Sequence, residues 1–400
     1  MFQTKCLKLN KSLYGQAESP LLWFQKLKKG LEARGFVQSD VDKCLFYSDK
    51  VICLCYVDDC CLWSKEQKHI DDLLETFRSE GDEYEWEFTK GDDSISEFLG
   101  VDIKPTGDGG YKLLQEGLIK KILKETGMED CNAKPTPTSS AGPIGQDKLG
   151  KRAHHQWSYS SIVGMLLYLA SNSRPELAFS VHQVARFTHS PRASHEEAVL
   201  RICRYLQGTK TEGLILRPSK ELKVDCWVDA DFAGLWGYED VTDPVCVKSR
   251  TGFVISIASC PLMWVSKLQQ EISTSTQESE FVALSQSMKD LIYVKRLVEE
   301  AVGEKGAAVL GLDKSSIKFT TKSTVYEDNN GALALANSTR VTPRTRHYAV
   351  KWFWFRQHVH APDKWVSVVK VDTKNQVADI MTKGLPQETF EYLRKKLCGW

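Results

Sequence analysis

The sequence has 400 residues, of which 42% are hydrophobic and 26% are charged. This composition is ordinary for a globular protein of two or three domains, and it excludes disordered, collagen-like and fibrous chains. The 53 basic and 52 acidic residues leave a net charge of +1, so the molecule as a whole is not expected to capture nucleic acid electrostatically, and any basic binding site must be local.

The chain carries no recognisable signal for export or for membrane insertion. Its longest apolar runs, 51–57 and 161–170, are shorter than the about 20 residues that a spanning helix needs. No charged segment followed by an apolar one comes after Met1. We therefore expect a cytoplasmic protein that makes no membrane contact, and we leave access to the nucleus open.

The 12 cysteines do not show the spacing of a zinc site. Two pairs, Cys53 with Cys55 and Cys60 with Cys61, lie inside an apolar run that resembles strands. Zinc ligands usually come in pairs separated by two to four residues, with a Gly or polar residue between them. We therefore expect reduced and mostly buried thiols and no bound zinc.

The first 130 residues alternate helix and strand patterns. Ser19 and Pro20 form a helix start, apolar residues follow at helical spacing, and Gly35 stands where a C-terminal glycine would. The remaining patterns predict three strands, a helix and then a hairpin, at 44–49, 51–57, 61–64, 65–79, and 97–103 with 111–115.

A change in composition predicts a boundary after this region. Residues 131–152 are rich in Pro, Thr, Ser, Gly and Ala without apolar periodicity, which is typical of a linker. Three helix patterns follow, and beyond residue 220 strands alternate with helices, the longest over 276–302, in mixed α/β order. We therefore divide the chain into 1–130, the linker 131–152, a helical segment 153–215, and 220–400, and we expect the last of these to fold alone.

Two groups of acids are candidates for chemistry. Asp58 and Asp59 lie at the tip of an apolar hairpin, where adjacent carboxylates repel each other and a divalent cation would relieve the repulsion. An Asp-rich turn without chemistry explains this pair equally well. The second group stands at strand ends and helix starts of the C-terminal segment: Asp229, Glu280, Asp328 and Asp379.

Acids in such positions can converge at one sheet edge. Phosphoryl transfer with two Mg²⁺ ions about 4 Å apart needs this arrangement. Each acid taken separately is explained more simply as a solvated surface charge. Spacing alone therefore does not decide between the two interpretations.

A series of motifs resembles, in the same order, the reverse transcriptase and ribonuclease H portions of copia-type (Pseudoviridae-like) retrotransposon polyproteins. The motifs include LNKSLYG (9–15), YVDD (56–59), VDADFAG (228–234), STQESEFVAL (275–284), YEDNNGALALA (326–336) and NQVADIMTKGLP (375–386). The resemblance covers essentially the whole chain. It implies a mixed α/β or α+β fold with a partial reverse transcriptase palm, a helical connection, and a ribonuclease H-like domain built on a five-stranded mixed sheet.

The resemblance assigns roles to the second group of acids. It implies that Asp229, Glu280, Asp328 and Asp379 are catalytic and hold Mg²⁺, for which Mn²⁺ can substitute. The implied partners are an RNA–DNA hybrid and the remaining parts of the retroelement polyprotein. Glu280 precedes Leu284 by four residues and so lies nearer the apolar side of its helix, yet Glu278 stays open as the catalytic glutamate. Asp231 is expected to play a supporting role.

The same resemblance makes Asp58 and Asp59 acids of a polymerase palm. Polymerases of this family use a third carboxylate upstream of the SLYG motif, and the sequence starts only a few residues before that motif. We therefore expect RNA-directed DNA polymerase activity to be lost and hybrid ribonuclease activity to be kept. The alternative is a catalytically silent remnant that binds nucleic acid or protein. Whether Met1 is the true start stays open.

A basic stripe is the candidate nucleic-acid contact. Arg344, His347 and Lys351 fall on one side of a helix expected to start at Thr342 and Pro343. Such cations, with aromatic residues beside them, can hold a phosphate backbone. A core helix with solvated cations and buried aromatics explains the pattern equally well.

Overall fold

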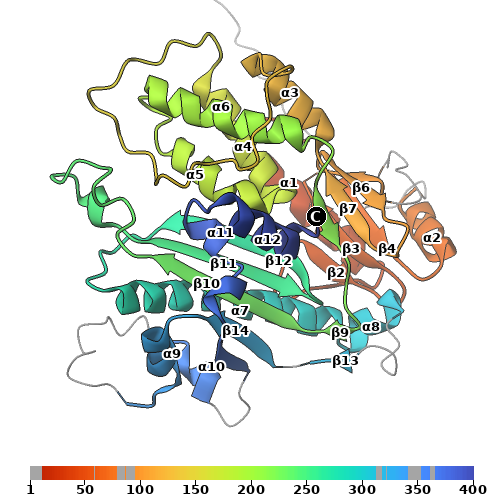
Figure 1. The fold of residues 1–400 in the computed structure, drawn as a ribbon. Coiled ribbons are helices and arrows are strands. Elements are labelled where there is room, and N and C mark those ends of the chain that lie inside the picture. The colour runs from red at the N-terminus through yellow and green to blue at the C-terminus, as the bar shows by residue number, and fades with distance from the viewer. Residues whose placement is uncertain are drawn as a thin grey trace, which may run out of the picture. The chain divides into compact units, whose positions relative to one another are not determined.

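The computed structural model describes residues 11–57, 59–78, 86, 95–311, 318–320, 322–340, 353–360 and 365–400. Contacts divide the chain into two compact units (Figure 1). Unit 1 comprises Met1–Ser94 and Tyr293–Ile317, and unit 2 comprises Ile95–Ile292 and Lys318–Trp400. Within the described ranges, no helix combines the length and the apolar character that a membrane span requires.

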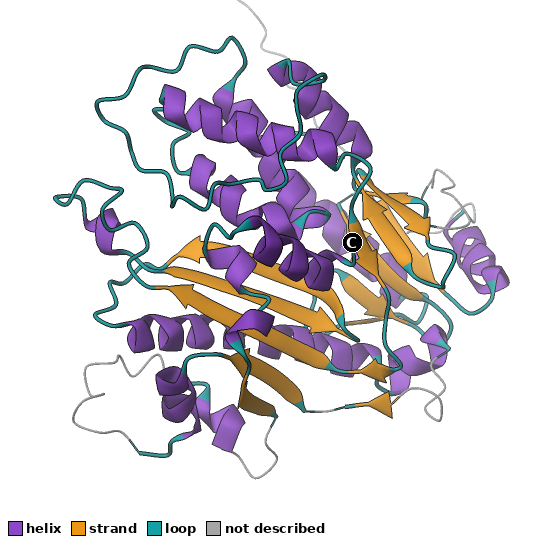
Figure 2. Cartoon of the chain, viewed as in Figure 1, coloured by secondary structure: helices purple, strands orange, loops and turns teal. Residues whose placement is uncertain are grey.

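Unit 1 contains a four-stranded antiparallel sheet in the order β1-β2-β3-β4 (Figure 2). Its elements are α1 (Ser19–Glu32), β1 (Val37–Gln38), β2 (Leu45–Tyr47), β3 (Ile52–Tyr56), β4 (Asp59–Trp63), α2 (Gln67–Phe77) and α8 (Glu304–Leu310). Pro20 stands in the first turn of α1, as predicted. Leu27 and Leu31 of α1 pack with Phe46 and Phe77 to form the core.

The principal sheet of unit 2 has five strands in the order β12-β11-β10-β14-β15. These are β10 (Val224–Asp231), β11 (Arg250–Ile257), β12 (Cys260–Leu268), β14 (Ser323–Glu327) and β15 (Val366–Lys370). β10, β11 and β12 pair antiparallel, whereas β10, β14 and β15 pair parallel. The predicted five-stranded mixed sheet is therefore confirmed.

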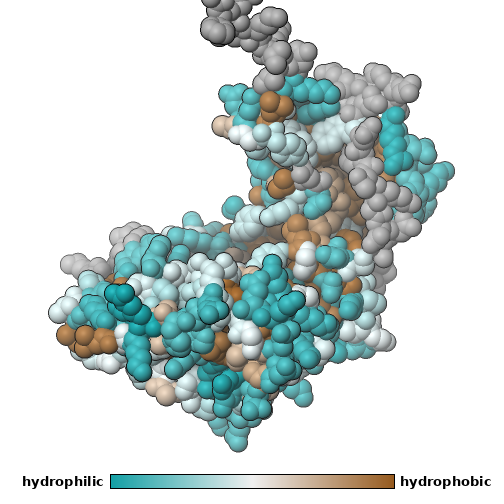
Figure 3. Space-filling model, turned by 90° about the horizontal axis from the view of Figure 1, so that it is seen from above, coloured by the Kyte–Doolittle hydropathy of each residue, from teal (hydrophilic) through white to brown (hydrophobic). Residues whose placement is uncertain are grey.

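Among the described residues, five α-helices belong to the same part of unit 2 as this sheet (Figure 1). They are α7 (Thr276–Ala301), which belongs to unit 2 as far as Ile292, α9 (Asn330–Asn337), α10 (Arg356–His360), α11 (Asp379–Thr382) and α12 (Gln387–Cys398). A short parallel pair, β9 (Glu221–Leu222) with β13 (Lys318–Phe319), stands apart from the sheet. On the face drawn in Figure 3, hydrophilic residues prevail over most of the lower half, with hydrophobic residues scattered among them.

The rest of unit 2 includes a second sheet and the helices α3 to α6. These elements are β5 (Glu97–Phe98), β6 (Val101–Pro105), β7 (Tyr111–Leu114), α3 (Glu116–Thr126), α4 (Tyr159–Asn172), α5 (Ala178–Ala185), α6 (Ala193–Gly208) and β8 (Leu214–Leu216). The predicted hairpin is present as β6-β7. The segment 97–103, expected as one strand, is instead a hairpin of its own, because Leu99 and Gly100 adopt positive φ angles of 50° and 69°.

One hydrophobic core joins the helical segment to the five-stranded sheet. Ile122 of α3, Leu166 of α4 and Ile202 of α6 belong to the same buried cluster as Ile380 of α11 and Leu393 of α12. The sequence placed a domain boundary between residues 215 and 220, but this core continues across it. The division into four segments stays a prediction, whereas the packing favours a single folding unit here.

A buried ion pair adds to the same connection. The guanidinium Nε of Arg174 donates to Glu176 Oε1 at 2.7 Å, and both side chains are inaccessible to solvent. The guanidinium also lies 5.3 Å from the ring centroid of Trp400 at the C-terminus. Replacing Arg174 or Glu176 by a neutral residue would leave the other charge buried without its ion-pair partner, which is strongly destabilising.

We predict that fragment 220–400 does not fold by itself, contrary to the expectation from the sequence, and that fragment 95–400 does. Without α3 to α6, the apolar faces of α11 and α12 would be exposed to water. Each Å² of exposed apolar surface would lower the free energy of unfolding by about 25 cal/mol. Thermal unfolding followed by circular dichroism compares the two fragments. A cooperative transition in fragment 220–400 would show that the sheet has a sufficient core of its own.

Candidate active site

Three carboxylates meet at one edge of the five-stranded sheet. Asp229 lies in β10, Glu280 lies near the start of α7, and Asp328 directly follows β14. One carboxylate oxygen of each lies within 4.8 Å of those of the other two. β10 and β14 are parallel neighbours, so their carboxyl ends bring Asp229 and Asp328 to the same edge. The structure thus brings together three of the four acids that the sequence assigned.

We call these three residues the acid cluster. Their side chains are largely shielded from solvent. The exposed fractions of Asp229 and Glu280 are 2% and 4%, and Asp328 is half-buried. Burial and the neighbouring carboxylate of Asp229 raise the pKa of Glu280 to about 11. Glu280 Oε2 accepts no hydrogen bond within the described parts of the chain. Asp328 Oδ2 is held by Thr373 Oγ1 at 2.8 Å.

Glu327 is a further acid of this region that the sequence analysis missed. It is fully buried at the end of β14, and its Oε1 accepts a hydrogen bond from the backbone N of Asn329 at 2.9 Å. Burial and the adjacent Asp328 raise its pKa well above the usual range. Its Oε2 also lacks a partner among the described residues. The signal was its place beside Asp328 in the YEDNNG motif.

Asp379 lies close by but is not a member of the acid cluster. It is the first residue of α11 and is buried, and its Oδ1 lies 2.9 Å from Lys383 Nζ. The same ammonium lies 3.6 Å from Asp229 Oδ2, so Lys383 bridges the two acids. Burial and Asp229 raise the pKa of Asp379 to about 7. Sequence reasoning had given Lys383 no role.

A close contact between α11 and the sheet sets the position of Asp379 and Lys383. Gly252 of β11 is paired with Asp229 of β10. A Cβ atom at Gly252 would lie 2.5 Å from Thr382 Cγ2 and 2.8 Å from Met381 Cβ, which is closer than real contacts allow. Thr382 Oγ1 in turn donates a hydrogen bond to Asp229 Oδ2. Glycine at this position is therefore what lets α11 pack closely against the sheet beside Asp229.

The structure distinguishes the two candidate glutamates of α7. Glu278 Oε2 accepts hydrogen bonds from Thr274 N at 2.7 Å and from Thr274 Oγ1 at 2.8 Å. Glu278 therefore caps the start of the helix, whereas Glu280 points into the acid cluster. This geometry favours Glu280. Burial raises the pKa of Asp231 to about 6, and its supporting role stays a prediction.

The remaining site predictions fall on other parts of the chain. Asp59 is exposed in β4, opposite Tyr56. Asp58 and the basic stripe of Arg344, His347 and Lys351 lie outside the described residues, so their roles stay predictions. Among the described aromatics beyond the stripe, Phe355 is a core residue: it is fully buried, with its ring 5.5 Å from that of Phe281.

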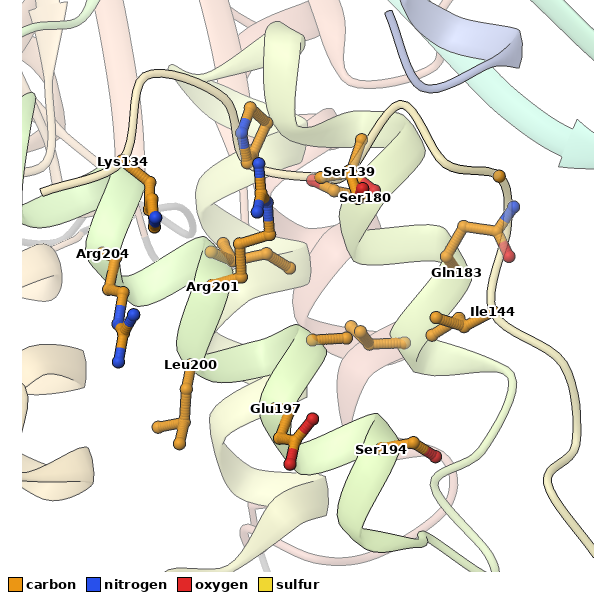
Figure 4. A pocket seen from close by; sticks show the side chains of 16 residues that line it. Lys134, Ser139, Ile144, Ser180, Gln183, Ser194, Glu197, Leu200, Arg201 and Arg204 are labelled. Atoms are coloured by element: carbon orange, nitrogen blue, oxygen red, sulfur yellow. The ribbon is translucent and has the colours of Figure 1, made fainter. Parts of the chain in front are cut away.

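A cavity of about 640 Å³ lies elsewhere in unit 2, between the segment 134–144 and helices α5 and α6 (Figure 4). The basic side chains Lys134, Arg201 and Arg204 line one part of it, and none of the four assigned acids does. Arg201 Nη2 donates to Thr136 Oγ1 at 2.9 Å. The candidate active site is therefore identified by converging carboxylates and not by this cavity.

The acid cluster fits a divalent cation. Its donors are carboxylate oxygens only, which suit hard cations such as Mg²⁺ and Mn²⁺. Such an ion would give Glu280 Oε2, which has no hydrogen-bond partner among the described residues, a ligand role, and it would reduce the mutual repulsion of the carboxylates. Asp229, Glu280 and Asp328 are the residues that would hold it.

Comparison with known proteins gives concordant matches. Residues 2–140 match the family model described as reverse transcriptase (RNA-dependent DNA polymerase). The retrovirus-related Pol polyprotein from transposon TNT 1-94 of Nicotiana tabacum is 31% identical over 98% of this chain and 28% of its own length. The corresponding polyprotein from transposon RE1 of Arabidopsis thaliana is 30% identical over 98% of this chain and 25% of its own length. The chain thus spans about a quarter of these relatives.

Among solved structures, LC11-RNase H1, isolated from compost by a metagenomic approach, is 15% identical. The match covers 42% of this chain and 96% of that chain, with a TM-score of 0.25. That score is too low to support an argument.

Glu280→Gln is predicted to raise the Tm of the metal-free protein at pH 8 by about 2–4 °C or more, equivalent to about 1 kcal/mol or more. An acid whose pKa is raised by folding destabilises the native state increasingly as the pH rises above the pKa of the unfolded chain. The gain should therefore shrink towards pH 5. Mg²⁺ should raise the Tm of the parent more than that of the variant. Glu278→Gln, outside the acid cluster, is the control, and an equal gain there would contradict the explanation.

Proposed function

This chain belongs to the family of copia-type retrotransposon Pol polyproteins, and from that premise we propose its function. We propose that its C-terminal part hydrolyses the RNA strand of RNA–DNA hybrids in a reaction that depends on Mg²⁺. The observation that carries the proposal is the convergence of carboxylate oxygens from Asp229, Glu280 and Asp328 within 4.8 Å. Three separate elements supply them, so their meeting is not a consequence of nearness in sequence.

The residues around the acid cluster have distinct tasks. When bound, a divalent cation supplies Lewis-acid stabilisation of the charge that develops on the transferring phosphate. Thr382 fixes one oxygen of Asp229, and Thr373 fixes one oxygen of Asp328. Both carboxylates are thereby oriented before substrate arrives, which preorganises the site. Asp379 was also predicted to hold Mg²⁺. This role stays a prediction, because the ammonium group of Lys383 lies against the carboxylates of both Asp379 and Asp229.

The substrate class follows from the family and not from a groove in the structure. Proteins recognise duplexes that contain RNA by shape and 2′-hydroxyls, so we expect cleavage without sequence preference. The intact set of acids favours an enzyme over a silent remnant that only binds. The expected loss of polymerase activity stays a prediction, which primer extension by the whole chain would test.

The whole 400-residue chain is expected to cut the RNA strand of a labelled hybrid with Mg²⁺ or Mn²⁺ but not with Ca²⁺, because Ca²⁺ adopts looser coordination. Glu280→Gln and Asp328→Asn should each lower kcat/KM by at least about 100-fold, since each removes a charge needed in the transition state.

Glu278→Gln is the matched control in the same helix and should keep near-parental cleavage. Gel analysis of products from purified variants with unchanged circular dichroism measures the difference. Near-parental cleavage by Glu280→Gln, or none by the parent with any of these ions, would refute the proposal.

A further inference from the structure

A second group of potential ligands lies in unit 1, in the hairpin of β3 and β4 (Figure 1). The sulfur atoms of Cys53, Cys55 and Cys60 all lie within 4.8 Å of one another, and those of Cys53 and Cys55 are 3.6 Å apart. We call this group the thiol cluster. Cys53 and Cys55 are 1% and 3% exposed, and Cys60 is half-buried.

The strand register explains how these residues meet. Cys53 and Cys55 are two positions apart in β3, so they lie on one face of the sheet. Cys60 of β4 is the cross-strand partner of Cys55, and directly opposed residues share a face. The zinc-site criterion used on the sequence compares only cysteines that are close along the chain, so it did not detect this group. Pairing of β3 with β4 brings the third sulfur into place.

The dimensions of the thiol cluster suit a metal ion. Metal–sulfur bonds of about 2.3 Å place thiolate sulfurs about 3.8–4.0 Å apart around a tetrahedral or trigonal ion. The 3.6 Å between the sulfurs of Cys53 and Cys55, and the upper limit of 4.8 Å for the other two pairs, are close to this range.

We propose that Cys53, Cys55 and Cys60 form a binding site for a soft d¹⁰ cation, and that Cu(I) fits it best. Thiolates select soft ions such as Cu(I) and Zn(II). Structural zinc sites use four ligands, whereas the cluster within the described residues offers three sulfur ligands. Three sulfur ligands are sufficient for Cu(I), which is stable in trigonal coordination. The ion would cross-link β3 to β4 beside the turn that leads to Asp59.

The test titrates Cu(I) into the whole chain under anaerobic, reducing conditions, in competition with bicinchoninate. The parent is expected to withhold one equivalent from the chelator and to develop a thiolate-to-copper absorption band in the ultraviolet. Cys60→Ser and Cys53→Ser should each lose that equivalent. Cys61→Ser is the matched control, because Cys61 follows Cys60 in β4 and so points to the opposite face; it should keep the equivalent.

Three results would overturn the proposal. The parent could bind no more Cu(I) than Cys60→Ser, or withhold Zn(II) better than Cu(I), or lose about two mass units on purification because Cys55 and Cys60 have formed a disulfide. Should the serine variants lose their circular dichroism signal, X-ray absorption of the copper-loaded parent decides. Three sulfur neighbours per copper support the site, and fewer sulfurs contradict it.

Discussion

Repulsion among the carboxylates of the acid cluster is the constraint on which the architecture of unit 2 depends. In water, Asp229, Glu280 and Asp328 would move apart, yet here they stay within 4.8 Å of one another. A rigid mixed sheet and the buried start of α7 hold them against that repulsion. Lys383 offsets part of the charge of Asp229, while buried Glu327 adds to the repulsion of Glu280. Ionising these acids together is therefore unfavourable in the fold, and the pKa of Glu280 and of Glu327 is raised accordingly.

The scaffold that resists this repulsion extends well beyond the sheet. Helix α11, which carries Asp379, packs against β11 and also against α5 of the helical segment. The buried cluster that contains Ile380 includes Leu166 and Val181, which lie some two hundred residues earlier. The helical connection is therefore part of the structural support of the candidate active site.

Much of this fold could be predicted, because local signals decide it. The Pro20 start of α1, the long helix α7 and the alternating strand and helix order gave the elements, and motifs gave Asp229, Glu280 and Asp328. The other features depend on contacts that no local pattern records. Lys383 meets Asp229 only after α11 has docked, and Cys60 meets Cys55 only through the register of two strands. The family resemblance likewise identifies functional parts and not the core that joins them.

The contact at Gly252 changes how copies of such an element should be judged. A copy can keep every acid and still lose the geometry of the site, because any side chain at this position would push α11, with Thr382 and Lys383, away from β10. Loss of the proposed activity therefore has more mutational routes than the four acids alone. A genomic survey that counts only intact carboxylates would overestimate the number of copies able to carry out the proposed reaction, and the codon for this glycine belongs in the same count.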